Sequence, residues 1–303
     1  MSYQLNLGEN LQDAVRRIVT ERVDYAIEQL RKRKGDRDKQ IHEARKSFKQ
    51  IRAVLRLIRG SLDKEIYNQE NATYRDAGQK LGTLRDAFVR IATLDKALQT
   101  INNPEAVGVA KVLRQSLQQR YDEAHHDLVE DRTAVNEVIA VLQEAKERIA
   151  QWELGESDFT LLAPGLKKNY RQGVGALKTA FDGEYSVEAF HDWRKRTKYL
   201  WNQMRVLAPL NEPMLSPYVD QLDALGDDLG LANDLAVLQE SLRSEELLET
   251  PGGQILLQEL ENQRLNLLKQ TEEPGQRIFM ETPRLFVARL RGYYWMQQQL
   301  QQS

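Results

Sequence analysis

One face of a predicted helix gathers the residues in this chain that are best suited to chemistry. The segment from His42 to Arg59 reads HEARKSFKQIRAVLRLIR, and its only acidic residue is Glu43. At about 100° per residue, its basic side chains and its histidine fall within an arc of roughly 140°, and they are His42, Arg45, Lys46, Lys49, Arg52, Arg56 and Arg59. Arginine binds two anion oxygens at once, lysine is a mobile point charge, and histidine donates from its ring N–H. This face could therefore bind an anion with many oxygens.

The same pattern returns 149 residues later as HDWRKRTKYLWNQMRV, with Trp201 in the place of Arg52 and Arg196 pointing off the basic face. The face of this second copy holds His191, Arg194, Lys195, Lys198 and Arg205. A further match follows at a spacing of 148 residues, where Gly78, Leu81-Gly82 and Asp86 correspond to Gly226, Leu229-Gly230 and Asp234. Two matches in the same order indicate an internal duplication. We therefore predict two tandem helical bundles, residues 1–160 and 161–303.

A solvated helix face is the simplest alternative explanation of each basic stripe. Such faces normally mix charge signs, because like charges three or four residues apart repel each other. These stripes are almost unmixed, although the chain has 43 basic and 45 acidic residues and a net charge of −2.

A face about 25 Å long suits a row of phosphates better than one small anion. Neither stripe has an evident set of exposed aromatic residues for stacking bases, so DNA and RNA fit less well.

The elements that must position these residues are helices. Residues 1–103 contain no proline and are rich in good helix formers, and alternating strand patterns are almost missing. The sequence therefore predicts an all-α fold with a basic groove or pore between the two bundles. The expected helices cover residues 9–31, 38–60, 70–100, 105–151, 165–181, 187–207, 217–243, 252–270 and 283–300. A break is expected at Glu273-Pro274-Gly275.

Other classes of protein have little support in the composition. There is no cysteine, so disulfides and cysteine-based zinc sites are excluded. No apolar run approaches the ~20 residues needed to span a bilayer, and no secretory signal is evident. We therefore expect a cytoplasmic protein that does not insert into membranes.

Enzymatic and metal chemistry are weakly supported. The helical positions that would complete a metal site beside His42 or His191 hold Arg or Lys, which repel a cation. His125 and His126 are adjacent and point about 100° apart on a helix. No Walker loop, nucleophile elbow or HExxH motif is present. We expect no catalytic residue, no metal and no cofactor, with a phosphohydrolase as the less favoured alternative.

A protein-interaction or scaffold module is a further alternative. The segment from Ala106 to Gln151 repeats apolar residues at a helical period and could expose a seam for a partner helix. The protein's own core explains the same period better. This alternative is also compatible with binding of a polyanion.

The repeated His-x-x-Arg-Lys-x-x-Lys helix followed by Leu-Gly-x-x-(Arg/Asn)-Asp resembles the CHAD family, the conserved-histidine α-helical domain. The resemblance covers nearly the whole chain. It implies an all-helical protein of two four-helix-bundle-like halves that binds inorganic polyphosphate through a basic surface or pore between them. We therefore also expect the protein to associate with polyphosphate granules.

The resemblance also assigns site residues. The motif falls on His42, Arg45, Lys46, Lys49, Arg52 and Arg56, and on His191, Arg194, Lys195, Lys198 and Arg205. Trp201 departs from the basic residue common at its position, which puts a contact there in doubt. Tyr170-Arg171 resembles a pair often found on the helix that enters the second half. The secondary candidates are Arg17, Arg85, Lys168, Arg171, Tyr199 and Asn233, whereas Asp86 and Asp234 are expected to orient neighbours or cap turns.

Overall fold

The structure is a computed structural model that describes residues 3–130, 132–155, 157–243 and 245–302, without the side chains of residues 127–130 and 302. Its elements are helices, and the described residues contain no strand, so the all-α prediction is confirmed. The first six helices are α1 (Leu11–Arg31), α2 (Arg37–Leu57), α3 (Lys64–Lys80), α4 (Gly82–Ala97), α5 (Pro104–Glu130) and α6 (Thr133–Ala150). The next six are α7 (Ala163–Phe181), α8 (Val187–Leu207), α9 (Glu212–Leu242), α10 (Pro251–Gln270), α11 (Glu272–Ile278) and α12 (Pro283–Gln302). Short 3₁₀ turns lie at η1 (Phe159–Leu161), η2 (Ala208–Leu210) and η3 (Glu246–Glu249).

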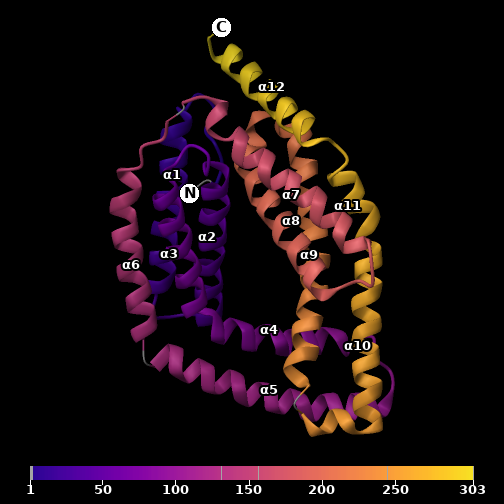
Figure 1. The fold of residues 1–303 in the computed structure, drawn as a ribbon. Coiled ribbons are helices and arrows are strands. Elements are labelled where there is room, and N and C mark those ends of the chain that lie inside the picture. Colours follow the sequence, from indigo (N-terminus) through magenta and orange to yellow (C-terminus); the bar gives the residue numbers. More distant parts are fainter. Residues whose placement is uncertain (1–2, 131, 156, 244, 303) are drawn as a thin grey trace.

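Several expected boundaries differ from the structure, among them the first residues of α3, Lys64 instead of 70, and of α9, Glu212 instead of 217. The helix expected over 70–100 is divided at the buried Leu81, and α4 then sets off in a new direction (Figure 1). The helix expected over 105–151 is two helices, α5 and α6. The break expected at Pro274 lies inside α11, where the proline occupies the first turn. Proline is tolerated there because the first N–H groups of a helix have no acceptor within it.

The two basic helices, α2 and α8, each begin at a side-chain cap. The Asp36 carboxylate accepts a hydrogen bond from the Lys39 N–H at 3.0 Å, and the Ser186 hydroxyl accepts one from the Ala189 N–H at 3.5 Å. Such caps satisfy N–H groups that have no acceptor within the helix. Both helices therefore start a few residues before their histidine, which sets the register of the basic faces.

The helices form two groups that share their cores. Helices α1, α2, α3 and α6 pack together, as do α7, α8 and α9 with α11 and α12. One hydrophobic core runs through both groups. A second core joins α4 and α5 to α9 and α10, across the end of the molecule where α4 and α5 lie (Figure 1). Both cores thus draw on residues from either side of position 160, and the division into bundles 1–160 and 161–303 stays a prediction.

The segment expected to expose a seam between Ala106 and Gln151 is largely turned inward. Leu113 and Leu117 lie in the second core, and Val135, Val138 and Leu142 lie in the first. Val112 is exposed. The helical period of these residues therefore serves mainly the protein's own packing. Among the described residues, no helix is both long and apolar enough to cross a membrane.

A close junction fixes α2 against α7 and α8. A Cβ atom added at Gly165 of α7 would lie 2.1 Å from the carbonyl oxygens of Arg56 and Leu57. The Gln203 side chain of α8 donates to the Ala53 carbonyl at 3.3 Å and accepts from Asn169 at 3.0 Å. Backbone contact of this kind leaves little freedom, so the two basic helices have a set relation to each other.

Replacing Gly165 tests the importance of this junction. We expect Gly165→Ala to destabilise the protein by about 1–3 kcal/mol, because overpacking a tight contact forces the backbone apart. The matched control is Gly175→Ala on the same helix, where an added Cβ meets nothing within 4 Å. That change should stabilise by about 0.5–1 kcal/mol through helix propensity. Urea unfolding of both variants measures the difference, and equal stability would contradict the role of Gly165.

Candidate anion-binding site

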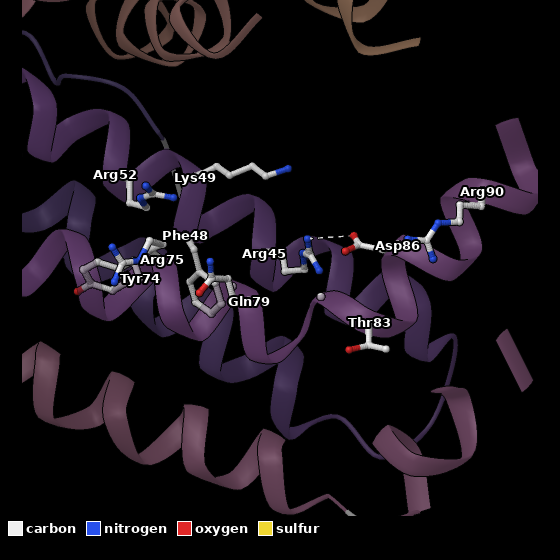
Figure 2. Close-up of a pocket in the computed structure, with 12 residues that line it drawn as sticks. Arg45, Phe48, Lys49, Arg52, Tyr74, Arg75, Gln79, Thr83, Asp86 and Arg90 are labelled. Atoms are coloured by element: carbon white, nitrogen blue, oxygen red, sulfur yellow. Dashed lines mark hydrogen bonds and ion pairs between the residues drawn. The ribbon is translucent and has the colours of Figure 1, made fainter. Parts of the chain in front are cut away.

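A hollow of about 490 Å³ opens where α2, α3 and α4 meet (Figure 2). Its charged lining consists of five cations and one carboxylate, namely Arg45, Lys49, Arg52, Arg75, Arg90 and Asp86. Phe48, Tyr74, Gln79 and Thr83 complete most of the wall. All of these residues belong to the first half of the chain, so the groove expected between the two bundles stays a prediction.

Two of the three pocket cations of α2, Arg45 and Arg52, are held by neighbouring oxygens. Arg45 donates from Nη1 to the Leu81 carbonyl at 2.9 Å and approaches Asp86 with Nη2 at 3.4 Å. Gly82 makes room for this guanidinium, since an added Cβ would lie 3.0 Å from Nη1. Arg52 donates from Nε to the Asn71 side chain at 3.2 Å. The duplicated Leu-Gly pair thus provides both a carbonyl acceptor and space for the arginine.

Lys49 is the centre of the positive charge. Its side chain extends in the hollow (Figure 2) and, among the described residues, makes no ion pair within 4 Å. The side chain is exposed to solvent, yet protein atoms surround it closely enough that burial is the largest cause lowering its pKa to about 8. Arg194, Arg45 and Arg85 lower the pKa further, and Asp234 opposes them. Lys49 therefore lies near cations from both halves of the chain.

Two further residues of α2 interact with neighbouring helices: Arg56 contacts α8, and His42 is influenced by a charge on α4. The Arg56 guanidinium stacks on the Tyr199 ring, with its carbon 3.9 Å from the ring centroid, and donates to the Tyr199 hydroxyl at 3.2 Å. His42 is half-buried, and burial together with the Arg85 charge lowers its pKa. The Nε groups of Arg90 and Arg194 are buried without a hydrogen-bond partner in the described part of the chain.

Comparison with known proteins gives the family. The sequence profile of the CHAD domain matches residues 17–243, which is most of the chain. The chain belongs to the CHAD family. PptA from Streptomyces chartreusis has a similar fold, with a TM-score of 0.65 at 14% identity over 90% of this chain and 100% of PptA. The crystal structure of the CHAD domain from the plant Ricinus communis gives a TM-score of 0.56 at 16% identity over 97% and 94% of the two chains. No curated protein matches the sequence.

Two cations of the second basic helix of this CHAD chain, Lys195 and Lys198, are held in ion pairs. Lys198 pairs with Asp223 at 3.2 Å and with Asp227 at 2.9 Å, both on α9. Lys195 and Arg196 share Asp192 at 3.2 and 3.3 Å. The carboxylates that pair with Lys198 therefore come from the neighbouring helix α9, whereas Asp192 lies on α8 itself.

The remaining second-copy residues have defined partners. Arg205 lies over the rings of Trp201 and Tyr3, at 4.8 and 5.3 Å from their centroids. The His191 ring nitrogen Nδ1 lies 2.7 Å from the Asn233 side-chain oxygen. Arg194 is the member of this stripe that adds its charge beside Lys49.

The secondary candidates divide between the cluster and the rest of the molecule. Arg85 and Tyr199 contact or influence the cluster, as described above. Arg17 instead pairs with Glu9 at 2.7 Å and Glu21 at 3.4 Å, which ties α1 to the N-terminal segment. Lys168 and Arg171 do not line the hollow. Lys46 points to solvent and pairs with Glu43 at 3.7 Å.

Sequence reasoning missed four polar residues of the pocket: Arg75, Gln79, Thr83 and Arg90. They lie on α3 and α4, outside the repeated basic helix. The sequence feature that could have pointed to them is the repeat match at Gly78 and Gly82, because all four residues lie within a few turns of these two glycines. Among the described residues, no group of three or more histidine or acidic side chains is placed to hold a metal ion.

The titration of Lys49 tests this geometry in the free protein. A pKa of about 8 lies below the ordinary value of 10.5. The charged form therefore opposes folding, and the contribution of Lys49 to stability rises as the pH increases from 8 towards 10.5. We expect NMR of ¹³C-labelled lysine to show one signal that titrates near pH 8 and is absent in Lys49→Gln.

Arg194→Gln should raise that pKa, because it removes a nearby positive charge. Arg171→Gln on the exposed side of α7 removes the same charge elsewhere and should leave it unchanged. An unchanged titration in Arg194→Gln would show that the two halves do not meet at Lys49.

Proposed function

We propose that this protein binds inorganic polyphosphate without hydrolysing it. The observation that carries the proposal is the pocket of five cations and one carboxylate, in which Lys49 makes no ion pair with a described residue. Cations held close together without counter-ions repel one another. An anion with closely spaced charges removes this cost when it binds.

A chain of phosphates suits this arrangement better than a single phosphate. The pocket cations belong to α2, α3 and α4, whereas Arg194 adds a further charge from α8. Each additional phosphate can meet another cation, while the loss of overall freedom on binding occurs only once. Binding also releases counter-ions, so the affinity should fall steeply with salt. As part of the same proposal, the protein acts in the cytoplasm and associates with polyphosphate granules.

The absence of catalysis is part of the proposal. Hydrolysis of phosphate chains by a metal-dependent route requires carboxylates that gather a divalent cation. The carboxylate of the pocket, Asp86, is oriented towards Arg45. The other charged groups that line the pocket are positive and would repel such a metal.

Titration with polyphosphates of graded length is the decisive experiment. We expect the affinity to rise with chain length and no orthophosphate to appear in the same samples, with or without Mg²⁺. Release of orthophosphate would support the phosphohydrolase alternative. Absence of binding at every length would contradict the proposal and favour a module that contacts only proteins.

The double variant Lys49→Gln/Arg194→Gln tests the site. We expect its affinity for long polyphosphate to fall at least tenfold. The slope of log K against log salt should become shallower by about 0.7–0.9 per lost contact, the values measured for nucleic acids. The control is Lys111→Gln/Lys178→Gln, which removes two exposed cations from α5 and α7. Equal losses in both double variants would show that binding follows overall charge rather than this pocket.

A further inference from the structure

The duplication allows the charged pocket to be compared with the same positions in the second half. At the repeat spacings of 149 and 148 residues, the two halves have Arg194 for Arg45 and Lys198 for Lys49, and Asp234 for Asp86. The other three pocket cations have no basic counterpart: Arg52, Arg75 and Arg90 correspond to Trp201, Asp223 and Leu238. Gln79 corresponds to a second new carboxylate, Asp227. Five cations and one carboxylate in the first half thus become two cations and three carboxylates.

The lysines of the two halves lie differently as a result. The Lys198 side chain lies along α9 between Asp223 and Asp227, and an added Cβ at Gly226 would come within 2.7 Å of its Cε. At the equivalent Gly78, the nearest side-chain atom belongs to the Phe48 ring, at 3.8 Å. Lys49 is therefore free to extend into the hollow, whereas Lys198 is held against its own bundle.

In the second half, the positions equivalent to Arg90 and Arg52 hold the apolar side chains of Leu238 and Trp201. Leu238, opposite Arg90 in the repeat, is fully buried in the second core. The Trp201 ring takes the place of the Arg52 guanidinium and lies 4.6 Å from the Lys198 ammonium. These two residues bring no positive charge to the corresponding place in the second half.

We propose that the two halves are unequal: the pocket of the first half binds a short run of linked phosphates through Arg75 and Arg90 together with the α2 cations, and Asp223 and Asp227 occupy Lys198 in place of phosphate. This rests on the proposed function and names where the polymer is bound most tightly. A volume of about 490 Å³ admits a small ligand and not a long polymer. The rest of the chain then lies outside the pocket, on the side of Arg194.

Arg75 is available for this role although it has a partner. It pairs with its neighbour Asp76 at 2.7 Å, and both side chains are about half exposed. An exposed pair of this kind contributes little free energy. A phosphate with two or three charges nearby can replace it. Arg90 has a buried Nε without an acceptor among the described residues.

Tripolyphosphate and a long polyphosphate are the two probes. We expect Arg75→Gln/Arg90→Gln to weaken tripolyphosphate binding at least tenfold, and Lys198→Gln to change it less than twofold. Equal losses in the two variants, or no loss in the first, would overturn the proposal. Thermal unfolding of each variant establishes that it is folded before it is titrated.

Releasing Lys198 supplies the second test. We expect Asp223→Asn/Asp227→Asn to bind long polyphosphate at least fivefold more tightly and with a steeper salt dependence, since a further cation becomes available. The gain should disappear when Lys198→Gln is added. The matched control, Glu212→Gln/Asp220→Asn, removes the same charge from exposed positions on α9. A gain that persists without Lys198, or that the control reproduces, would contradict the role given to the two aspartates.

Titration of the wild-type protein distinguishes failure of the proposed function from failure of the proposed inequality between the halves. If it binds neither probe, the proposed function itself fails. If it binds both, and the variants do not follow the order given above, polyphosphate binding stands and the inequality of the halves is wrong.

Discussion

The repulsion between cations held close together is the constraint on which the rest of the site depends. Lys49 has cations from α2, α4 and α8 around it, and their charges add to burial, the largest cause, in lowering its pKa to about 8. Such a cluster persists only when other contacts fix the helices that carry it. The backbone contact at Gly165 and the buried hydrogen bonds of Gln203 do so at the junction of α2, α7 and α8. The stability of this junction is what keeps the cluster ready for an anion.

Duplication explains the form of the site, and divergence explains its charge. In both halves an arginine of the basic helix lies near the glycine of a Leu-Gly pair, Arg45 at Gly82 and Arg194 at Gly230. This geometry survives because it concerns packing as well as charge. The surrounding positions differ in charge between the halves, as where Arg75 has Asp223 as its counterpart. One half therefore keeps a concentration of positive charge while the other satisfies its lysine internally.

The sequence predicted the helical class and the two basic helices, because both follow from periodicity and repetition. It did not predict that Lys198 is paired, since Asp223 and Asp227 are 25 and 29 residues away and reach it only through the packing of α9 on α8. The turn at Leu81 was missed for a similar reason. The same Leu-Gly pair lies within a continuous helix at Gly230, so local sequence does not decide the outcome.

That difference at the Leu-Gly pair also bears on why the pocket exists in one half. In the first half the chain turns at Leu81, so α3 and α4 present Arg75 and Arg90 to the same hollow from two directions. In the second half α9 continues without a break past Gly230, and Leu238 lies in the core with α10 instead. A concave wall requires the turn, and a straight helix offers only one face. The charge difference and the backbone difference therefore reinforce each other: the half with the turned helix is the half that kept its cations.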